Sequence, residues 1–558
     1  MACVGLAALV LSSCHREDLA DHIPPPGTYD VRILRDEWGV PHIFGQRDPD
    51  TAYGLGYAHC EDDWTSIEDA ILLARGHMAA VHGRSYAQFD YMIHLMRVWE
   101  FVEAKYESDL SPEFRAVVEA YCDGITHYAA LHREKMPHIE LPVTGKDVIA
   151  GAVLKAPILY ELHKDLEKLM GGSMPISRKG VITAMADMHE HFAQGCRIGS
   201  NAWAVGRSRS ADGAVRLAIN SHMPWTGPVA FYEAHLHSEE GWNMVGGTFP
   251  GGPVIFLGHD RNKGWCHTIN RPDLADIYAL EINPDNENQY RFDDEWRDFE
   301  RDTARIRVRL WGAISWTFKR ELLWSVHGPV LRTDDGAYAI RFAGYGEVGQ
   351  LEQWYRMNKA RNLDEFLAAM RSLRISSFNT IYADKDGNLF YVYNGQFPVR
   401  PAGHDWQGIL PGDTSDTLWN EFYPFDALAQ VLNPASDFVQ SCNSSPFYTT
   451  VGEGNPRPED FPKAMGIQTH LTNRAMRART LYGEDNSITR EEFYAYKYDK
   501  TYAPDAPVVR RVNAILHADL PDEPLVQEAA EVLRSWDRRT NRDNRAAALA
   551  VMIGEDHP

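Results

Sequence analysis

The heptapeptide Gly199-Ser200-Asn201-Ala202-Trp203-Ala204-Val205 stands where the character of the chain changes. The turn residues Ala211-Asp212-Gly213 follow it, and then comes the largely apolar run Val215-Arg216-Leu217-Ala218-Ile219. Two such runs joined by an Asp-Gly turn are typical of a β-hairpin, because glycine accepts the positive φ of a tight turn. We therefore predict a strand, a turn and a second strand beginning at this heptapeptide.

The sequence on either side of this hairpin alternates between helical and strand patterns. Residues 52–82 and 147–166 carry apolar side chains at helical spacing, so the part before the hairpin is mainly helical. After the hairpin, Asp335-Gly336 and Asp386-Gly387 mark further turns between β-rich runs, and a helical pattern returns at 363–373. Helices that flank paired strands predict an α+β fold with stacked layers of sheet and helix.

The composition is that of an acidic globular protein. The chain has 558 residues and a formal net charge of −22. Strong acidity argues against a nucleic-acid partner, since phosphate backbones are bound by basic surfaces.

The N-terminus predicts export. Residues 1–13 are apolar, and Leu11-Ser12-Ser13-Cys14 is similar to a bacterial lipobox, in which the cysteine carries a lipid anchor. The run is shorter than the about 20 residues that span a bilayer. We expect a periplasmic protein or a membrane-anchored lipoprotein held at Cys14. The alternative is an ordinary N-terminus.

On both sides of the hairpin, short motifs follow one another in the order found in a known family. The heptapeptide resembles the junction at which penicillin acylases, cephalosporin acylases and acyl-homoserine-lactone acylases cut themselves. The other matching segments are Gly39-Val40-Pro41-His42-Ile43, Gly54-Leu55-Gly56-Tyr57-Ala58-His59, Phe231-Tyr232-Glu233-Ala234-His235-Leu236, Gly251-Gly252-Pro253-Val254, His267-Thr268-Ile269, His327-Gly328-Pro329-Val330 and Gln440-Ser441-Cys442-Asn443. The resemblance covers most of the chain and is nearest to the cephalosporin and acyl-homoserine-lactone acylase branch.

The resemblance implies a fold and a division of the chain. The expected fold is the αββα four-layer sandwich of N-terminal-nucleophile hydrolases, with a mainly helical small chain wrapped around it. Residues 1–26 would hold the signal, lipobox and linker, 27–175 the helical small chain, and 176–199 a connecting spacer. Residues 200–558 would form the large catalytic chain, which we expect to be truncated at its C-terminus, because the apolar helix 546–552 ends the sequence abruptly. The partner of each processed chain would be the other, in a heterodimer.

The chemistry expected at Ser200 depends on cleavage after Gly199. A serine hydroxyl is a poor nucleophile until a base takes its proton. An N-terminal serine carries its own base, because an α-amine has a pKa of about 7.7–8. That amine exists only after the Gly199–Ser200 peptide has been broken, and a glycine before the serine leaves the attack uncrowded. The chain contains no GxSxG motif, so the sequence does not support a serine nucleophile of the α/β-hydrolase type.

The remaining catalytic roles follow from the resemblance. The side-chain amide of Asn443 and the backbone N–H of Ile269 would stabilise the oxyanion, each worth about 3–4 kcal/mol in well-studied hydrolases. His222 would hydrogen-bond the serine or orient its amine. Arg474 would position the asparagine and the amine, although Arg477 and Arg479 are alternatives one helical turn away.

An acidic loop follows the Ile269 motif. Asp273 and Asp276, with the backbone carbonyl of Ala275 between them, are hard oxygen ligands suited to Ca²⁺. The resemblance to penicillin G acylases implies a structural calcium here, completed by Glu167. The alternative is a solvated acidic loop. No organic cofactor is implied.

The acyl pocket should be apolar. The resemblance places Met223, Trp225, Tyr232, Phe256 and Leu257 along its wall, and Phe256 with Leu257 favours an aliphatic or aromatic acyl group over an acidic one. Plain core packing is the alternative for each of them.

The function that these expectations describe is a self-processing N-acyl amide hydrolase. Its substrate would be a small-molecule amide between an apolar acyl group and an amine such as a β-lactam nucleus or a homoserine lactone. One alternative is the same fold acting on another acyl amide, such as a lipopeptide. Another is an inactive or truncated scaffold that serves as a binding or surface protein.

Overall fold

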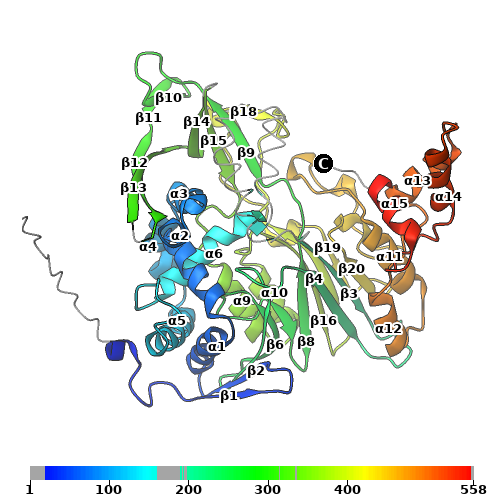
Figure 1. Ribbon diagram of the computed structural model, residues 1–558, viewed down its shortest axis with the longest axis horizontal. Helices are drawn as coiled ribbons and strands as arrows, with labels where there is room; N and C mark the ends of the chain where they lie inside the picture. The colour runs from blue at the N-terminus through cyan, green and yellow to red at the C-terminus, as the bar shows by residue number, and fades with distance from the viewer. Residues whose placement is uncertain are drawn as a thin grey trace, which may run out of the picture.

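The computed structural model describes residues 19–159, 198–312, 314–333 and 336–554, with the single positions 162, 186, 189, 190 and 193 (Figure 1). The lipobox, Glu167 and most of the expected spacer lie outside these residues. Within them, no helix is both long and apolar enough to cross a membrane.

The strands form a large, mostly antiparallel sheet, two smaller sheets and a short hairpin. The nine-stranded sheet has the order β1-β2-β5-β6-β7-β8-β16-β17-β19. Its strands are β1 (Val31–Arg35), β2 (Pro41–Gly45), β5 (Tyr232–Ser238), β6 (Asn243–Thr248), β7 (Leu257–His259), β8 (Lys263–Thr268), β16 (Ser377–Asp384), β17 (Leu389–Gly395) and β19 (Gln430–Leu432). The three-stranded sheet has the order β20-β3-β4, with β20 (Phe438–Ser441), β3 (Gly199–Val205) and β4 (Arg216–His222). The predicted hairpin is therefore confirmed as β3 and β4.

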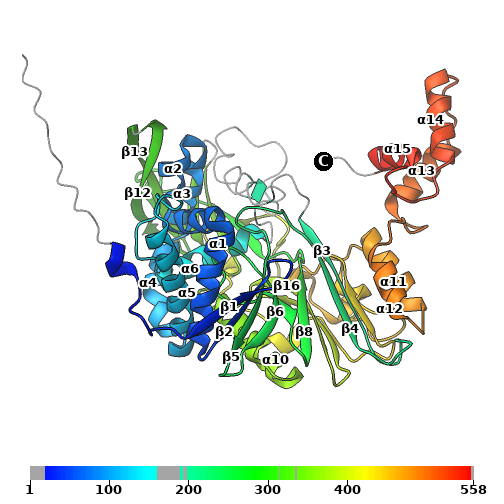
Figure 2. The ribbon, with the colours of Figure 1, turned by 60° about the horizontal axis from the view of Figure 1, so that its bottom comes forward.

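The two sheets face each other and are covered on both sides by helices. Strands β3 and β20 contact β8, β16 and β17 of the larger sheet. Helix α11 (Asn473–Glu484) covers the outer face of the three-stranded sheet, where α12 (Arg490–Lys497) packs beside it, whereas α1, α9 and α10 cover the larger sheet (Figure 2). The order helix, sheet, sheet, helix is the four-layer arrangement expected from the sequence.

The helices before the hairpin form one packed group. They are α1 (Asp48–Arg75), α2 (Met78–His82), α3 (Ala87–Leu95), α4 (Val98–Asp109), α5 (Pro112–Leu131) and α6 (Gly145–Leu159). The pattern over 52–82 is divided because α1 ends at Gly76, whose φ of 68° is left-handed. Helices α1 and α5 cross closely at two glycines, since a Cβ on Gly56 would lie 2.2 Å from the Tyr121 carbonyl and one on Gly124 would lie 2.2 Å from that of Tyr53.

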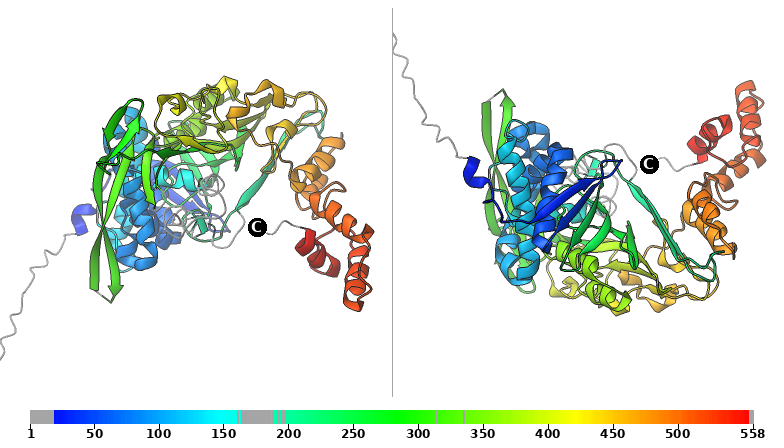
Figure 3. Two further views of the ribbon diagram at one scale, coloured as in Figure 1. Left: turned by 90° about the horizontal axis from the view of Figure 1, so that it is seen from above. Right: turned by 90° about the horizontal axis from the view of Figure 1, so that it is seen from below.

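The remaining elements lie around this sandwich. A six-stranded sheet has the order β12-β13-β14-β15-β9-β18, and its long strands β12 and β13 run across the outer side of α2 and α3 (Figure 3). The strands are β9 (Ala275–Leu280), β12 (Glu300–Trp311), β13 (Ile314–Ser325), β14 (Gly328–Thr333), β15 (Gly336–Phe342) and β18 (Ile409–Pro411), beside a hairpin of β10 (Gln289–Phe292) and β11 (Glu295–Asp298). The later helices are α9 (Gln350–Lys359), α10 (Leu363–Met370), α13 (Pro507–His517), α14 (Pro524–Arg534) and α15 (Arg545–Gly554).

Candidate active site

Ser200 lies on the central strand of the three-stranded sheet. On β3 it pairs with Ser221, and Gly199 pairs with His222 on β4. The serine is buried, with 6 % of its surface exposed. Because side chains alternate across a strand, Ser200 points to one face of β3, and Gly199 and Asn201 lie on the other.

Asn443 joins two distant segments at this point. It follows β20 with a left-handed φ of 55°, which asparagine tolerates better than most residues. Its Oδ1 accepts a hydrogen bond from the Ser200 N–H at 2.7 Å, and its Nδ2 donates to the Ile269 carbonyl at 2.7 Å. The fold thus brings Ser200, Ile269 and Asn443 together.

Arg474 closes the site from the start of α11. Thr472 caps this helix by accepting from the Ala475 N–H, and its hydroxyl also donates to the Cys442 carbonyl at 2.9 Å. Arg474 therefore reaches the Ser200 carbonyl at 2.6 Å and the Asn443 Oδ1 at 3.0 Å.

The other two arginines of this helix point elsewhere. Arg477 pairs with Asp499, and Arg479 donates to the Tyr448 carbonyl. Of the three candidates, Arg474 is the one at the site.

The surroundings of Gly199 leave no room for a side chain. A Cβ there would lie 2.9 Å from the Asn443 Oδ1 and 3.4 Å from the His222 Nδ1. His222 also lies 3.4 Å from the Asn201 Nδ2 through its Nε2. Burial, and then the nearby Arg474 guanidinium, lower the pKa of His222, so its ring is neutral near pH 7. A neutral ring can accept or donate, which suits a group that orients an amine or a hydroxyl.

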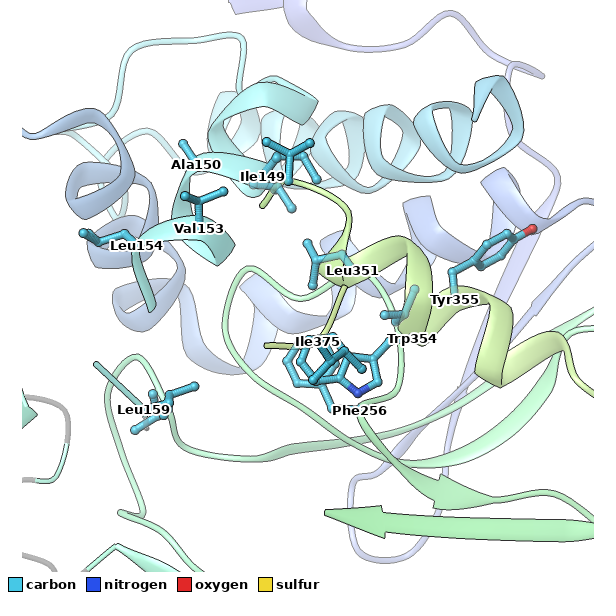
Figure 4. Close-up of a cluster of buried hydrophobic side chains, with 14 of the residues drawn as sticks. Ile149, Ala150, Val153, Leu154, Leu159, Phe256, Leu351, Trp354, Tyr355 and Ile375 are labelled. Atoms are coloured by element: carbon cyan, nitrogen blue, oxygen red, sulfur yellow. The ribbon is translucent and has the colours of Figure 1, made fainter. Parts of the chain in front are cut away.

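A cavity of about 90 Å³ opens beside the serine. Its wall includes Ser200, Ile269, Met223, Phe256 and Leu257. Trp354 and Leu351 of α9 and Leu159 of α6 supply more of its apolar lining, and Trp354 lies against Phe256 with ring centroids 4.5 Å apart (Figure 4). An apolar cavity that reaches a buried serine suits the acyl part of a substrate.

Two of the expected pocket residues lie elsewhere. Trp225 is 96 % exposed in the segment after β4, where nothing in the cavity covers it. Tyr232 stacks on His59 with ring centroids 3.9 Å apart, and its hydroxyl donates to Asp62 at 2.6 Å. Both residues are corrections to the expected wall, since Trp225 lies in solvent and Tyr232 bonds Asp62 on α1.

The acidic residues expected to hold calcium have a cationic partner within the protein. A buried guanidinium, that of Arg400, contacts the Asp276 carboxylate at 3.0 Å and the Asp273 carboxylate at 3.0 Å. Trp419 donates to Asp276 and Gln407 donates to Asp273, each at 2.7 Å. Arg400 thus supplies positive charge where the cation was expected. Ala275 begins β9, and no group of three or more metal-ligating side chains occurs among the described residues.

The structure adds residues that the sequence reasoning missed. Asn201 bonds both Arg474 and His222, and its place beside Ser200 in the heptapeptide was the available signal. Thr268 accepts from Asn379 at 3.0 Å and shares a 2.7 Å hydrogen bond with Ser441, which ties β8 to β16 and β20 behind Ile269. Lys155 lies in the cavity wall, although its helix was predicted simply as apolar.

Comparison with known proteins finds relatives over most of the chain. The chain is 27 % identical over 548 residues to acyl-homoserine lactone acylase PvdQ of Pseudomonas putida, covering 88 % of this chain and 70 % of that protein. It is 25 % identical over 512 residues to penicillin G acylase of Escherichia coli, covering 75 % of this chain and 59 % of the relative.

A solved structure and a family model extend the comparison. The thermostable penicillin G acylase from Alcaligenes faecalis matches with a TM-score of 0.51 and 26 % identity, covering 62 % of this chain and 60 % of that one. The chain thus spans about 60 to 70 % of the relatives it matches. The family model described as penicillin amidase matches residues 30–555, so the chain belongs to the penicillin amidase family.

Proposed function

We propose that this protein is a self-processing N-acyl amide hydrolase with Ser200 as its nucleophile. The observation that carries the proposal is the position of the Ser200 nitrogen. It donates to Asn443 at 2.7 Å while the serine borders an apolar cavity. Cleavage of the Gly199–Ser200 peptide would turn that nitrogen into an α-amine, already held by the residue that is to assist the reaction.

In the proposed reaction, the α-amine takes the hydroxyl proton of Ser200 as the oxygen attacks the amide carbon of the substrate. The carbonyl oxygen becomes an oxyanion, which the Asn443 Nδ2 and the Ile269 N–H would stabilise. The C–N bond then breaks, and the amine leaves with the proton held by the α-amine. Water repeats the sequence on the acyl ester, which releases the acid and restores Ser200.

His222 and Arg474 act as positioning groups in this scheme. Arg474 fixes Asn443 and the Ser200 backbone through the contacts at 3.0 and 2.6 Å. His222, neutral near pH 7, would orient the new amine.

The substrate we propose is an amide between an apolar acyl group and a small amine. A homoserine lactone and a β-lactam nucleus are the two amines suggested by the relatives, which are an acyl-homoserine lactone acylase and a penicillin G acylase. Hydrolysis of the first would quench quorum signals, and hydrolysis of the second would belong to antibiotic metabolism.

The proposed location follows from the apolar N-terminal segment, and the proposed two-chain form follows from cleavage after Gly199. Export would bring the protein to the periplasm or to a lipid anchor at Cys14, and cutting after Gly199 would give two chains that stay together. The remaining alternative is an uncut scaffold that only binds. The arrangement of Ser200, Asn443 and Arg474 favours catalysis over that alternative.

Mass spectrometry of the purified protein tests the proposal. We expect two chains, the larger beginning at Ser200, and hydrolysis of at least one amide from a panel of acyl-homoserine lactones, penicillins and glutaryl-cephalosporins. Ser200→Ala should stay uncut and inactive, whereas Ser108→Ala, a change on the exposed side of α4, should be cut and active. Normal cutting of the Ser200→Ala variant would show that another residue is the nucleophile.

A further inference from the structure

A buried lysine faces the cavity beside Ser200. Lys155 lies on α6, one of the helices before the cut, and only 9 % of its surface is exposed. It lines the same cavity as Ser200 and Met223, whose other walls are largely apolar. A charged group in such a wall is expensive to bury, so a position like this is unusual without a binding partner.

Lys155 has more N–H donors than acceptors among the described residues. Its ammonium group carries three N–H bonds, and the Pro250 carbonyl accepts one of them at 2.7 Å. No carboxylate of the described residues forms an ion pair with it. Burial lowers the pKa of Lys155 to about 8, which still leaves most of the group protonated at pH 7.

The other titratable groups that line or adjoin this cavity are engaged or uncharged. Asp147 in the same wall is bound by the Arg75 guanidinium at 2.7 and 2.8 Å. His267 accepts from the Trp354 indole at 2.9 Å and bonds Thr380 at 3.0 Å. Burial, and then the charge of Lys155, lower the pKa of the neighbouring His59 to about 3, so that ring is neutral and does not compensate the ammonium.

We infer that the acyl pocket takes an acyl chain whose far end carries an oxygen acceptor, bound by Lys155. This inference rests on the proposed function and changes the acyl group proposed there. The apolar walls would hold the methylene part of the chain, and Lys155 would donate to a carboxylate or, more weakly, to a ketone oxygen. The oxygen acceptor would complete the hydrogen bonding of a cation that Pro250 satisfies only in part. It departs from the expectation of a purely apolar acyl group, which Phe256 and Leu257 had suggested, because the far end of the chain would be polar.

Matched substrates test the inference. Amides of one amine would be compared in pairs, hexanoyl against adipyl and pentanoyl against glutaryl, with 5-oxohexanoyl as the uncharged acceptor. A hydrogen bond from a charged donor is strong enough to favour the adipyl or glutaryl amide about tenfold or more in kcat/KM. Lys155→Met keeps the length of the side chain and removes the charge, so it should abolish this preference.

A matched control and a binding measurement separate the outcomes. Lys146→Met, a change at a partly exposed lysine of α6 that pairs with Glu103, should keep the preference. If the wild-type protein cleaves no amide, the proposed function fails. Calorimetric binding of adipic acid monoamide and of hexanamide then decides the inference alone. The inference is overturned if neither acceptor-bearing ligand is preferred, or if Lys155→Met leaves the preference unchanged in both measurements.

Discussion

At the scale of single residues, the site depends on the absence of a side chain at position 199. A methyl group there would lie 2.9 Å from the Asn443 Oδ1, and Asn443 also holds the Ser200 nitrogen. Gly199→Ala should therefore displace the asparagine and slow self-cleavage by about 100-fold, the order of loss that an ångström of misplacement causes. The measurement is the rate at which the uncut chain disappears on a denaturing gel. Gly408→Ala, where the added Cβ would be 3.7 Å or more from its neighbours, should cut at the normal rate. Equal rates for the two variants would show that the space around Gly199 is not needed.

At the scale of elements, a buried ion pair fixes the start of β9. Arg400 holds Asp276, which is fully buried, and burial raises the pKa of this carboxyl to about 6 against the opposing effect of Arg400. Arg400→Met would leave the carboxylate without its cation, so we expect a loss of about 3–5 kcal/mol of unfolding free energy at pH 7.

The pH dependence of that loss has a definite sign. A carboxyl whose pKa is higher in the folded state than in the unfolded chain binds its proton more readily when folded, so stability rises as the pH falls toward 4. The deficit of Arg400→Met should therefore shrink between pH 7 and pH 5, as followed by urea unfolding. Since Arg400 supplies the positive charge, EDTA should leave the melting temperature of the wild-type protein unchanged. A clear fall in that temperature, restored by Ca²⁺, would contradict this account.

The same elements show what the sequence can and cannot predict. The hairpin of β3 and β4 and the helical character of 52–82 follow from local signals, the Asp-Gly turn and the apolar spacing. Arg400 pairs with a carboxylate 124 residues earlier, and no spacing rule links them. The buried position of Lys155 could not be predicted from the sequence for a similar reason. A lysine within an apolar helix is normally predicted to lie on the face of the helix that is exposed to solvent. Lys155 points inward because α6 packs against Pro250 and the cavity.

At the scale of the whole molecule, the chain before Ser200 and the chain after it share one sheet. Strand β2 lies beside β5 in parallel register, with His42 opposite His235, so the segments on either side of the proposed cut are hydrogen-bonded along their backbones. The buried carboxylate of Asp48, on α1, accepts from Lys359 at 2.6 Å and from the Tyr355 hydroxyl at 2.5 Å, both on α9.

These contacts do not depend on the peptide bond at 199. After cleavage we expect both chains to elute together in gel filtration and to separate only in denaturant. Asp48→Ala would remove the acceptor that Lys359 and Tyr355 share, although the Glu240 carbonyl and Glu113 still accept from them. The variant should lower the denaturant concentration at which the chains part, by the equivalent of about 1–3 kcal/mol. Glu134→Ala, at a side chain that is 71 % exposed, should change it by less than about 0.5 kcal/mol. Separate elution of the two wild-type chains in native buffer would mean that the shared sheet does not hold the chains together once the peptide bond is broken.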